Sequence, residues 1–140
     1  MSLREVQPIL HVSSIEQSVE FYQEKLGFDL GFAMTGDGGR MVHASVINGA
    51  VTIMLGYDEA TDAEQRRGGG AVLYTYLDDV DAYYERVRSA GTALTEEITD
   101  QYWGDRTFTV TDPDGYVLTF AQTVRAFDPA NVPVPSAATV

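Results

Sequence analysis

The 140-residue sequence predicts an α+β fold built from two tandem β-α-β-β-β modules. Two observations predict this fold class. Short apolar runs surround a single amphipathic segment, and this arrangement occurs twice along the chain. Apolar positions also repeat at an offset of 65 residues, the pairs being Ile15 and Val80, Val19 and Tyr84, Tyr22 and Val87, Ile53 and Leu118, and Leu55 and Phe120. An offset carried through helix and strand positions indicates an internal duplication.

The first module opens with an apolar run at residues 6–12 that suits a strand. A capping box follows, formed either by Ser13 with Glu16 or by Ser14 with Gln17. Apolar residues spaced by three and four positions then predict a helix that ends at a glycine; they are Ile15, Val19, Tyr22 and Leu26, followed by Gly27.

Three further runs complete the first module, at residues 28–34, 41–47 and 51–55. Asn48-Gly49 between the last two is a strong hairpin signal. With these two residues as the turn, His43 is expected opposite Met54. Ser45 and Thr52 then share the face of His43, and the other face is apolar, as a face packed by a helix should be.

The same order returns after a linker-like segment at residues 58–70. Asp78-Asp79 caps the second helix, and Ala90-Gly91 ends it. The expected strands are residues 71–77, 92–98, 106–111 and 116–122. We expect one domain over residues 1–140, with modules at about 5–57 and 71–123 and an extended or disordered tail at 124–140.

The amino-acid composition excludes several classes of partner and site. A net charge of −12 argues against nucleic acid and anionic membrane surfaces as partners, and it permits a cationic ligand or serves only for solubility. The absence of cysteine removes disulfides and thiolate nucleophiles. No apolar run is long enough for a membrane span or an export signal, so we expect a cytoplasmic protein.

Two phrases carry a family resemblance: "SVEFYQEKLGF" in the first helix and "TDPDGYVLTF" before and within the last strand. With the repeated module, they make residues 5–122 resemble the glyoxalase / bleomycin-resistance / extradiol-dioxygenase (vicinal oxygen chelate) superfamily. The resemblance implies two curved mixed sheets around a cleft, and for many members a homodimer. It does not specify a reaction, because this fold hosts several chemistries as well as pure binding proteins.

Metal-dependent members of that family carry ligands on the first and last strands of each module. The matching positions here are Gln7, Met54, Val72 and Thr119. The family's usual ligands are His or Glu, whereas these four side chains offer a weak carbonyl, a soft thioether, an aliphatic group and a neutral hydroxyl. We therefore expect no metal site and no cofactor.

Strand alternation indicates which residues line the cleft with those four. On the first strand these are Ile9 and His11, and on the fifth they are Tyr74 and Tyr76. For the closing hairpin, a turn of two or four residues places Arg106, Phe108 and Val110 on the face of Thr119. Trp103 precedes that strand, near the cleft mouth by family analogy. The expected ligand-binding set is Gln7, His11, His43, Met54, Val72, Tyr74, Tyr76, Trp103, Arg106, Phe108 and Thr119.

Several of these residues have an alternative interpretation. The tyrosines and Phe108 could be core residues, and the histidines could be satisfied strand residues rather than a base and its orienting group. Asp105 and Arg106 could form an ordinary surface pair, and Arg106 could instead clamp a ligand oxygen. Asp112 and Asp114 are interpreted as turn residues.

The leading hypothesis is a non-catalytic binding protein of bleomycin-resistance type. It would sequester an aromatic antibiotic or metabolite, neutral or cationic, as a homodimer and without a metal. The alternative is an enzyme of the superfamily (a lyase, isomerase or ring-cleaving dioxygenase) that uses the cleft histidines or a relocated metal. A third possibility is a subunit that binds a partner through a sheet edge or the proline-containing tail. No catalytic residue is assigned.

Overall fold

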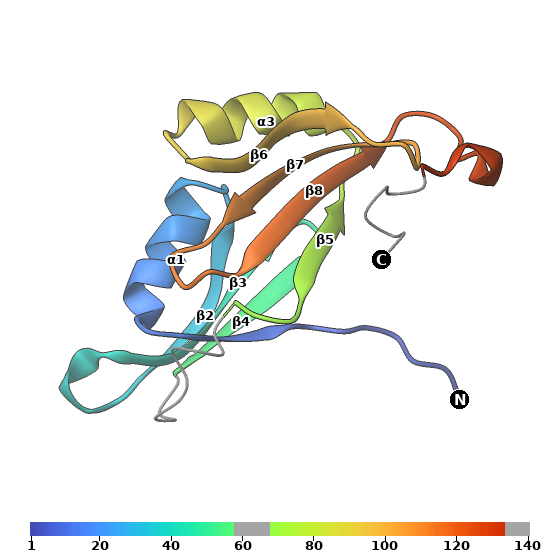
Figure 1. The fold of residues 1–140 in the computed structure, drawn as a ribbon. Helices are drawn as coiled ribbons and strands as arrows, with labels where there is room; N and C mark the ends of the chain where they lie inside the picture. The colour runs from blue at the N-terminus through green and yellow to red at the C-terminus, as the bar shows by residue number, and fades with distance from the viewer. Residues whose placement is uncertain (58–67, 134–140) are drawn as a thin grey trace, which may run out of the picture.

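The computed structural model describes residues 1–57 and 68–133 (Figure 1). The first module consists of β1 (Ile9–Val12), α1 (Ile15–Glu24), β2 (Asp29–Thr35), β3 (Met41–Asn48) and β4 (Val51–Tyr57). The second consists of β5 (Val72–Tyr76), α3 (Val80–Ser89), β6 (Leu94–Asp100), β7 (Asp105–Thr111) and β8 (Val117–Thr123). Short 3-10 turns lie at Asp37–Gly39 and Pro129–Asn131.

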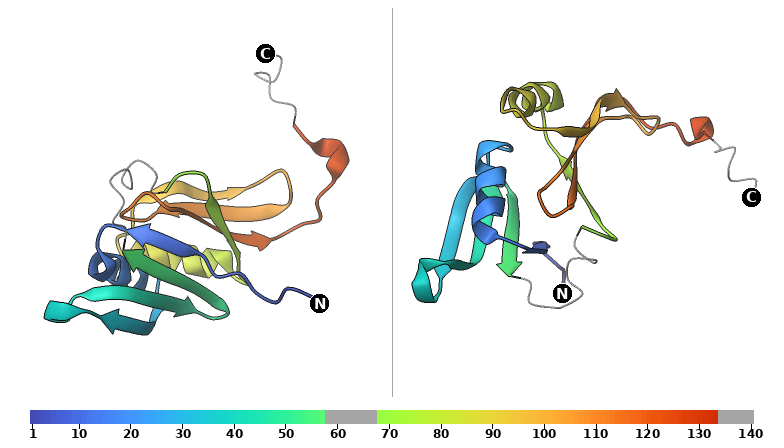
Figure 2. Two further views of the ribbon diagram at one scale, coloured as in Figure 1. Left: turned by 90° about the horizontal axis from the view of Figure 1, so that it is seen from below. Right: turned by 60° about the vertical axis from the view of Figure 1, so that its left-hand side comes forward.

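Each module forms one mixed four-stranded sheet with its helix on one face (Figure 2). The strand orders are β1-β4-β3-β2 and β5-β8-β7-β6. In both sheets the first strand of the module runs parallel to the last, and the other neighbours are antiparallel. The predicted α+β class and the β-α-β-β-β order are therefore confirmed.

The pairing of the parallel strands repeats the 65-residue offset in space. Ile9 lies opposite Met54 in the first sheet, and Tyr74 lies opposite Thr119 in the second. The two modules thus have the same register at this position, as a duplication requires.

Both helices begin and pack as their sequences predict. Ser14 is the N-cap of α1 and accepts a hydrogen bond from the Gln17 backbone, which selects the second of the two capping alternatives. Asp79 caps α3 in the same way. The predicted apolar positions of both helices are buried: Ile15, Val19, Tyr22, Leu26, Val80, Tyr84 and Val87.

The β3–β4 hairpin has a different register from the predicted one. Asn48 pairs with Val51, so the turn is Gly49-Ala50, and His43 lies opposite Gly56 rather than Met54. Gly49 has a φ of +58°, a left-handed conformation that only glycine adopts easily. The change amounts to two residues, so each side chain stays on its predicted face.

The β7–β8 hairpin corrects a second prediction. Its turn has three residues, Pro113 to Gly115, closed by hydrogen bonds between Asp112 and Tyr116 and between Gly115 and Asp112. Thr109 therefore lies opposite Thr119. An odd-length turn reverses the alternation that a two- or four-residue turn would give, and the strand faces of β7 are exchanged.

A single cluster of buried apolar residues spans both modules. Polar contacts add to it: the Tyr22 hydroxyl donates to Asp112 (2.9 Å), the Tyr83 hydroxyl to the Leu26 carbonyl (2.6 Å) and the Tyr116 hydroxyl to the His11 carbonyl (2.8 Å). Module association is thus both apolar and hydrogen-bonded.

The predicted linker and tail fall only partly within the described residues. Residues 58–67 and 134–140 lie outside them. The first part of the tail is attached to the turn before β7, because the backbone N–H groups of Val124 and Arg125 both donate to the Gly104 carbonyl. None of the helices in the described ranges has the length and hydropathy needed to cross a membrane.

Candidate functional site

The helix-free face of the second sheet carries exposed aromatic side chains. Val72, Tyr74 and Tyr76 alternate along β5 on this face, and the two tyrosines keep 39% and 62% of their surface exposed. Their rings are 5.3 Å apart at an interplanar angle of 61°. Thr119 joins them from β8, directly opposite Tyr74. The structure therefore places these four residues on one face, as the sequence predicts.

A buried carboxylate lies at the end of this face. Asp105, the first residue of β7, is only 3% exposed. Its Oδ2 accepts hydrogen bonds from the hydroxyls of Tyr74 (2.7 Å) and Tyr76 (3.0 Å) and from the indole Nε1 of Trp103 (3.2 Å). Its Oδ1 accepts one from the Thr123 hydroxyl (2.9 Å). We call these five residues the Asp105 cluster.

The hydrogen bonds decide the ionisation of this cluster. Burial acts to raise the pKa of Asp105, but the four donated hydrogen bonds together outweigh it and hold that pKa below its usual value. Burial, with the hydrogen bond to Asp105 adding to it, raises the pKa of Tyr74 to about 12. At neutral pH the cluster is therefore one carboxylate surrounded by neutral donors.

This ionisation predicts a pH-dependent effect of Asp105→Asn. A carboxyl whose pKa is lowered in the folded state contributes stability that is present above its usual value of 3.8 and is lost as the pH falls through the lowered pKa. We expect the substitution to lower the free energy of unfolding by about 1–3 kcal/mol at neutral pH, and by progressively less below pH 3.8. Urea unfolding of both proteins from neutral pH down to about pH 3 measures the difference; a difference that stays constant would contradict the assignment.

Trp103 is positioned by the turn that precedes β7. The Gln101 backbone donates to the Asp105 carbonyl (2.7 Å), and Gly104 donates to the Gln101 carbonyl (3.1 Å). This turn brings the indole to the Tyr74 hydroxyl, with Nε1 donating over 3.0 Å. Trp103, expected near the cleft mouth, lies beside the aromatic face, where its indole donates to Tyr74 and Asp105.

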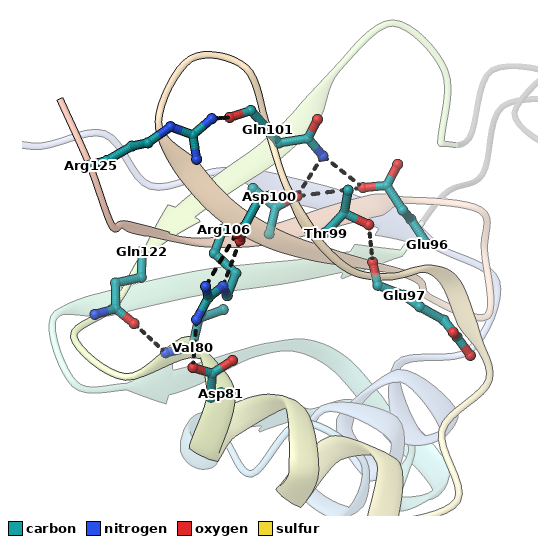
Figure 3. Close-up of polar contacts among 11 residues, drawn as sticks. Val80, Asp81, Glu96, Glu97, Thr99, Asp100, Gln101, Arg106, Gln122 and Arg125 are labelled. Atoms are coloured by element: carbon teal, nitrogen blue, oxygen red, sulfur yellow. Dashed lines mark hydrogen bonds and ion pairs between the residues drawn. The ribbon is translucent and has the colours of Figure 1, made fainter. Parts of the chain in front are cut away.

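Two predicted cleft residues lie on the opposite face. Phe108 is fully buried under α3, with its ring 5.3 Å from that of Tyr84. Arg106 bonds Asp100 (2.6 Å) and Asp81 (3.0 Å), the latter in the first turn of α3 (Figure 3). Assigning Arg106 and Phe108, together with Val110, to the face of Thr119 was wrong because the hairpin turn has an odd number of residues.

On the helix-free face of the first sheet, the two histidines lie on either side of one strand, β4. His11 on β1 and His43 on β3 both lie opposite Gly56 on the strand between them. Gly56 has no side chain, and a Cβ at that position would lie 3.3 Å from the His11 ring. Met54 shares the face, between Ile9 and Ser45. Gln7 precedes β1, is exposed and hydrogen-bonds Glu5.

A groove of about 380 Å³ lies between the two modules. It is bounded by the segment before β1, the beginning of β4 and strand β5. Of the predicted ligand-binding residues, it contains Val72, Tyr74 and Tyr76. The remaining lining residues are Glu5, Val6, Pro8, Ala50, Val51, Thr52, Ile53, Leu73 and Thr75.

Sequence reasoning missed Asp105 and Thr109 as residues of the aromatic face. One alternative made Asp105 half of an ordinary surface pair with Arg106, but the two side chains lie on opposite faces of β7 and bond different partners. Thr109 approaches Thr119, with 3.0 Å between the hydroxyl oxygens. A sequence signal was present: Gly49 and Gly115 lie 66 rather than 65 residues apart, which a one-residue change in turn length would explain, and such a change reverses the alternation.

The described residues contain no group of three or more His, Cys, Asp or Glu side chains placed to hold a metal ion. On the first sheet, the two positions that match the family's metal ligands are Met54 and Gln7, so neither gives the histidines a carboxylate neighbour. On the second sheet Asp105 is surrounded by hydrogen-bond donors instead of further ligands. These faces offer ring stacking, hydrogen bonding and electrostatic attraction, and the histidine face also offers two groups that can act as acid or base.

The family follows from a comparison with known proteins. A model of the Glyoxalase/Bleomycin resistance protein/Dioxygenase superfamily matches residues 6–120. The chain belongs to this superfamily. It is 31% identical to an uncharacterized protein of Mycobacterium bovis over 130 residues, covering 84% of this chain and 82% of that one.

Two relatives carry names that describe binding or resistance. The bleomycin resistance protein of Geobacillus stearothermophilus is 28% identical over 127 residues, covering 85% of this chain and 96% of that protein. The crystal structure of TnmS3, an antibiotic binding protein from Streptomyces sp. CB03234, superposes with a TM-score of 0.68 at 29% identity, covering 88% of this chain and 98% of TnmS3. The similarity supports a role at the level of the superfamily, and antibiotic binding is a role of some relatives with this fold.

Proposed function

We propose that this protein binds an aromatic small molecule, an antibiotic or a related metabolite, and acts by sequestering it without a metal. The observation that carries the proposal is the aromatic face of β5 with Trp103 beside it. Tyr74 and Tyr76 present angled, solvent-accessible rings, and the groove that they line is about 380 Å³. Flat aromatic walls with few polar groups suit a planar ligand.

The residues at the family's metal positions support the metal-free part of the proposal. Thr119 is hydrogen-bonded to Thr109, Val72 cannot coordinate, and Met54 is a thioether. The bleomycin resistance protein and the antibiotic binding protein among the relatives support an antibiotic as ligand.

We propose that the protein forms a homodimer. Both helix-free faces expose apolar side chains, among them Ile9 at 54% and Val72 at 54%, and a second copy could cover part of them. Analytical ultracentrifugation distinguishes the states, with the dimer at twice the 15.3 kDa of one chain. A chain that stays monomeric at the concentrations of the binding assays would remove the dimer from the proposal and leave the binding to be judged separately.

Ligand binding is tested by calorimetry with bleomycin-type and phenazine-type compounds. We expect saturable binding, and we expect Trp103→Ala to weaken it about tenfold or more, because an aromatic wall of the site is lost. Arg106→Gln is the control, since Arg106 points toward α3 and should leave the affinity unchanged. No binding of any compound at millimolar concentration, or equal losses in both variants, would contradict the proposal.

The two histidines favour a second candidate, an enzyme of the superfamily that uses acid–base chemistry. His11 and His43 lie on either side of Gly56, on a face where a substrate could approach both rings. Turnover of a bound compound that disappears in His11→Asn and His43→Asn, with binding retained, would favour this candidate over sequestration. Unchanged compound after prolonged incubation would favour sequestration.

A further inference from the structure

The Asp105 cluster carries a negative charge, and none of the ion pairs among the described residues involves Asp105. The carboxylate accepts all of its hydrogen bonds from the neutral groups of Tyr74, Tyr76, Trp103 and Thr123. Among the described ion pairs, the neighbouring guanidinium of Arg106 turns away to the other face of the sheet. A buried charge held by hydrogen bonds alone still attracts a positive group at its surface.

Two partly exposed aromatic residues are hydrogen-bonded to this charge. Two tyrosine hydroxyls donate to the same carboxylate oxygen, over 2.7 and 3.0 Å. Donation to an anion increases the electron density of a phenol ring and therefore strengthens the attraction of its face for a cation. Tyr76 is 62% exposed and Tyr74 39%, so their faces remain available to a ligand.

The adjoining groove has the same electrostatic character. Glu5 is the one charged side chain among the described residues that line it, and it is acidic. The chain as a whole carries a net charge of −12. Local and long-range fields therefore act in the same direction, toward a positive ligand.

We propose that the Asp105 cluster is a subsite for a substituted ammonium group, such as a trimethylammonium or tertiary amine, carried by the ligand. The inference rests on the proposed function and specifies the chemistry of its ligand. Asp105 is only 3% exposed and both of its oxygens accept hydrogen bonds, so an incoming cation contacts the ring faces rather than Asp105 itself. A bulky, weakly hydrated alkylammonium suits such a surface better than a primary amine, which needs hydrogen-bond acceptors.

The test uses a pair of probes that differ only in charge: hydroxybenzyl-trimethylammonium and its carbon isostere, neopentylphenol. Binding is measured by calorimetry and by the indole N–H signal in NMR spectra, which reports this subsite directly because Trp103 is the single tryptophan. We expect the cationic probe to bind about tenfold or more tightly than its isostere and to shift the indole signal.

Matched variants separate the local charge from the overall charge. Asp105→Asn should reduce the preference for the cationic probe to about twofold or less. Asp100→Asn changes the net charge equally, but Asp100 is bonded to Arg106 on β7, so the preference should persist. Tyr76→Leu tests the ring without a burial cost, because Tyr76 is largely exposed, and it should weaken the cationic probe selectively.

The outcomes distinguish the inference from the proposed function. Equal affinity for both probes, or equal effects of Asp105→Asn and Asp100→Asn, would overturn the ammonium subsite while leaving a neutral aromatic ligand possible. If Asp105→Asn does not fold, an unchanged preference in Tyr76→Leu would overturn the inference instead. Failure of both probes and of the bleomycin-type compounds would overturn the inference and the proposed function together.

Discussion

Replacing Gly104 with alanine is expected to destabilise the protein by about 3 kcal/mol and to disrupt the aromatic face. Gly104 has a φ of +101°, and a Cβ there would lie 2.4 Å from the carbonyl oxygen of Arg125. This oxygen belongs to the backbone and cannot rotate away, so the turn and the segment after β8 must separate. Trp103 and Asp105 flank Gly104 directly and would move with it.

Gly39 provides the matched control for this substitution. Its φ is +78°, but a Cβ at that position meets nothing within 4 Å. Gly39→Ala should therefore cost only the backbone strain of a left-handed residue, about 1–2 kcal/mol. Denaturant unfolding measures both variants, and the emission of Trp103 should change in Gly104→Ala alone. Equal stability losses with unchanged emission would show that the contact with Arg125 is not what holds the turn.

Replacing Asp112 with alanine is expected to cost about 3 kcal/mol or more, because it removes three hydrogen bonds at once. The carboxylate is 4% exposed and accepts from the Tyr22 hydroxyl and from the backbone of Asp114 and Tyr116, each over 2.9 Å. Burial is the main reason that the pKa of Asp112 is raised. The substitution leaves the Tyr22 hydroxyl buried without this acceptor, and an unsatisfied buried donor is destabilising in itself.

A double-mutant cycle with Tyr22→Phe separates the contact from the general loss of packing. Tyr22→Phe alone should cost about 1–2 kcal/mol, because Asp112 keeps its two backbone donors. In the Asp112→Ala background the same change should be neutral or stabilising, since it removes the orphaned hydroxyl. Additive losses in the double variant would indicate that the two residues act independently and that the contact between the modules is weak.

The fold could be predicted from the sequence because its signals are local and occur twice. The Ser14 cap and the apolar positions of α1 have their counterparts in α3, and the parallel strand pairs repeat at the same offset. The helix-packed apolar faces of β3 and β4 were predicted correctly although the predicted turn was wrong, because a register change of two residues preserves strand alternation.

The candidate site could be predicted only where it depends on a single strand. Alternation along β5 placed Tyr74 and Tyr76 correctly without any knowledge of turns. The contribution of β7 depends on the length of the Asp112–Tyr116 connection, and one residue in that turn decides whether Asp105 or Arg106 shares the face of Thr119. The hydrogen bonds that converge on Asp105 come from three segments of the chain, β5, the turn before β7 and β8, and no spacing in the sequence predicts such a convergence.

A crystal structure of the protein with a bleomycin-type compound tests most directly whether the aromatic face of β5 binds a small molecule. We expect density for the compound's aromatic group against Tyr74, Tyr76 and Trp103, with its cationic end at the Asp105 cluster. Density at any other surface, or an unoccupied β5 face in crystals grown at saturating compound, would contradict it.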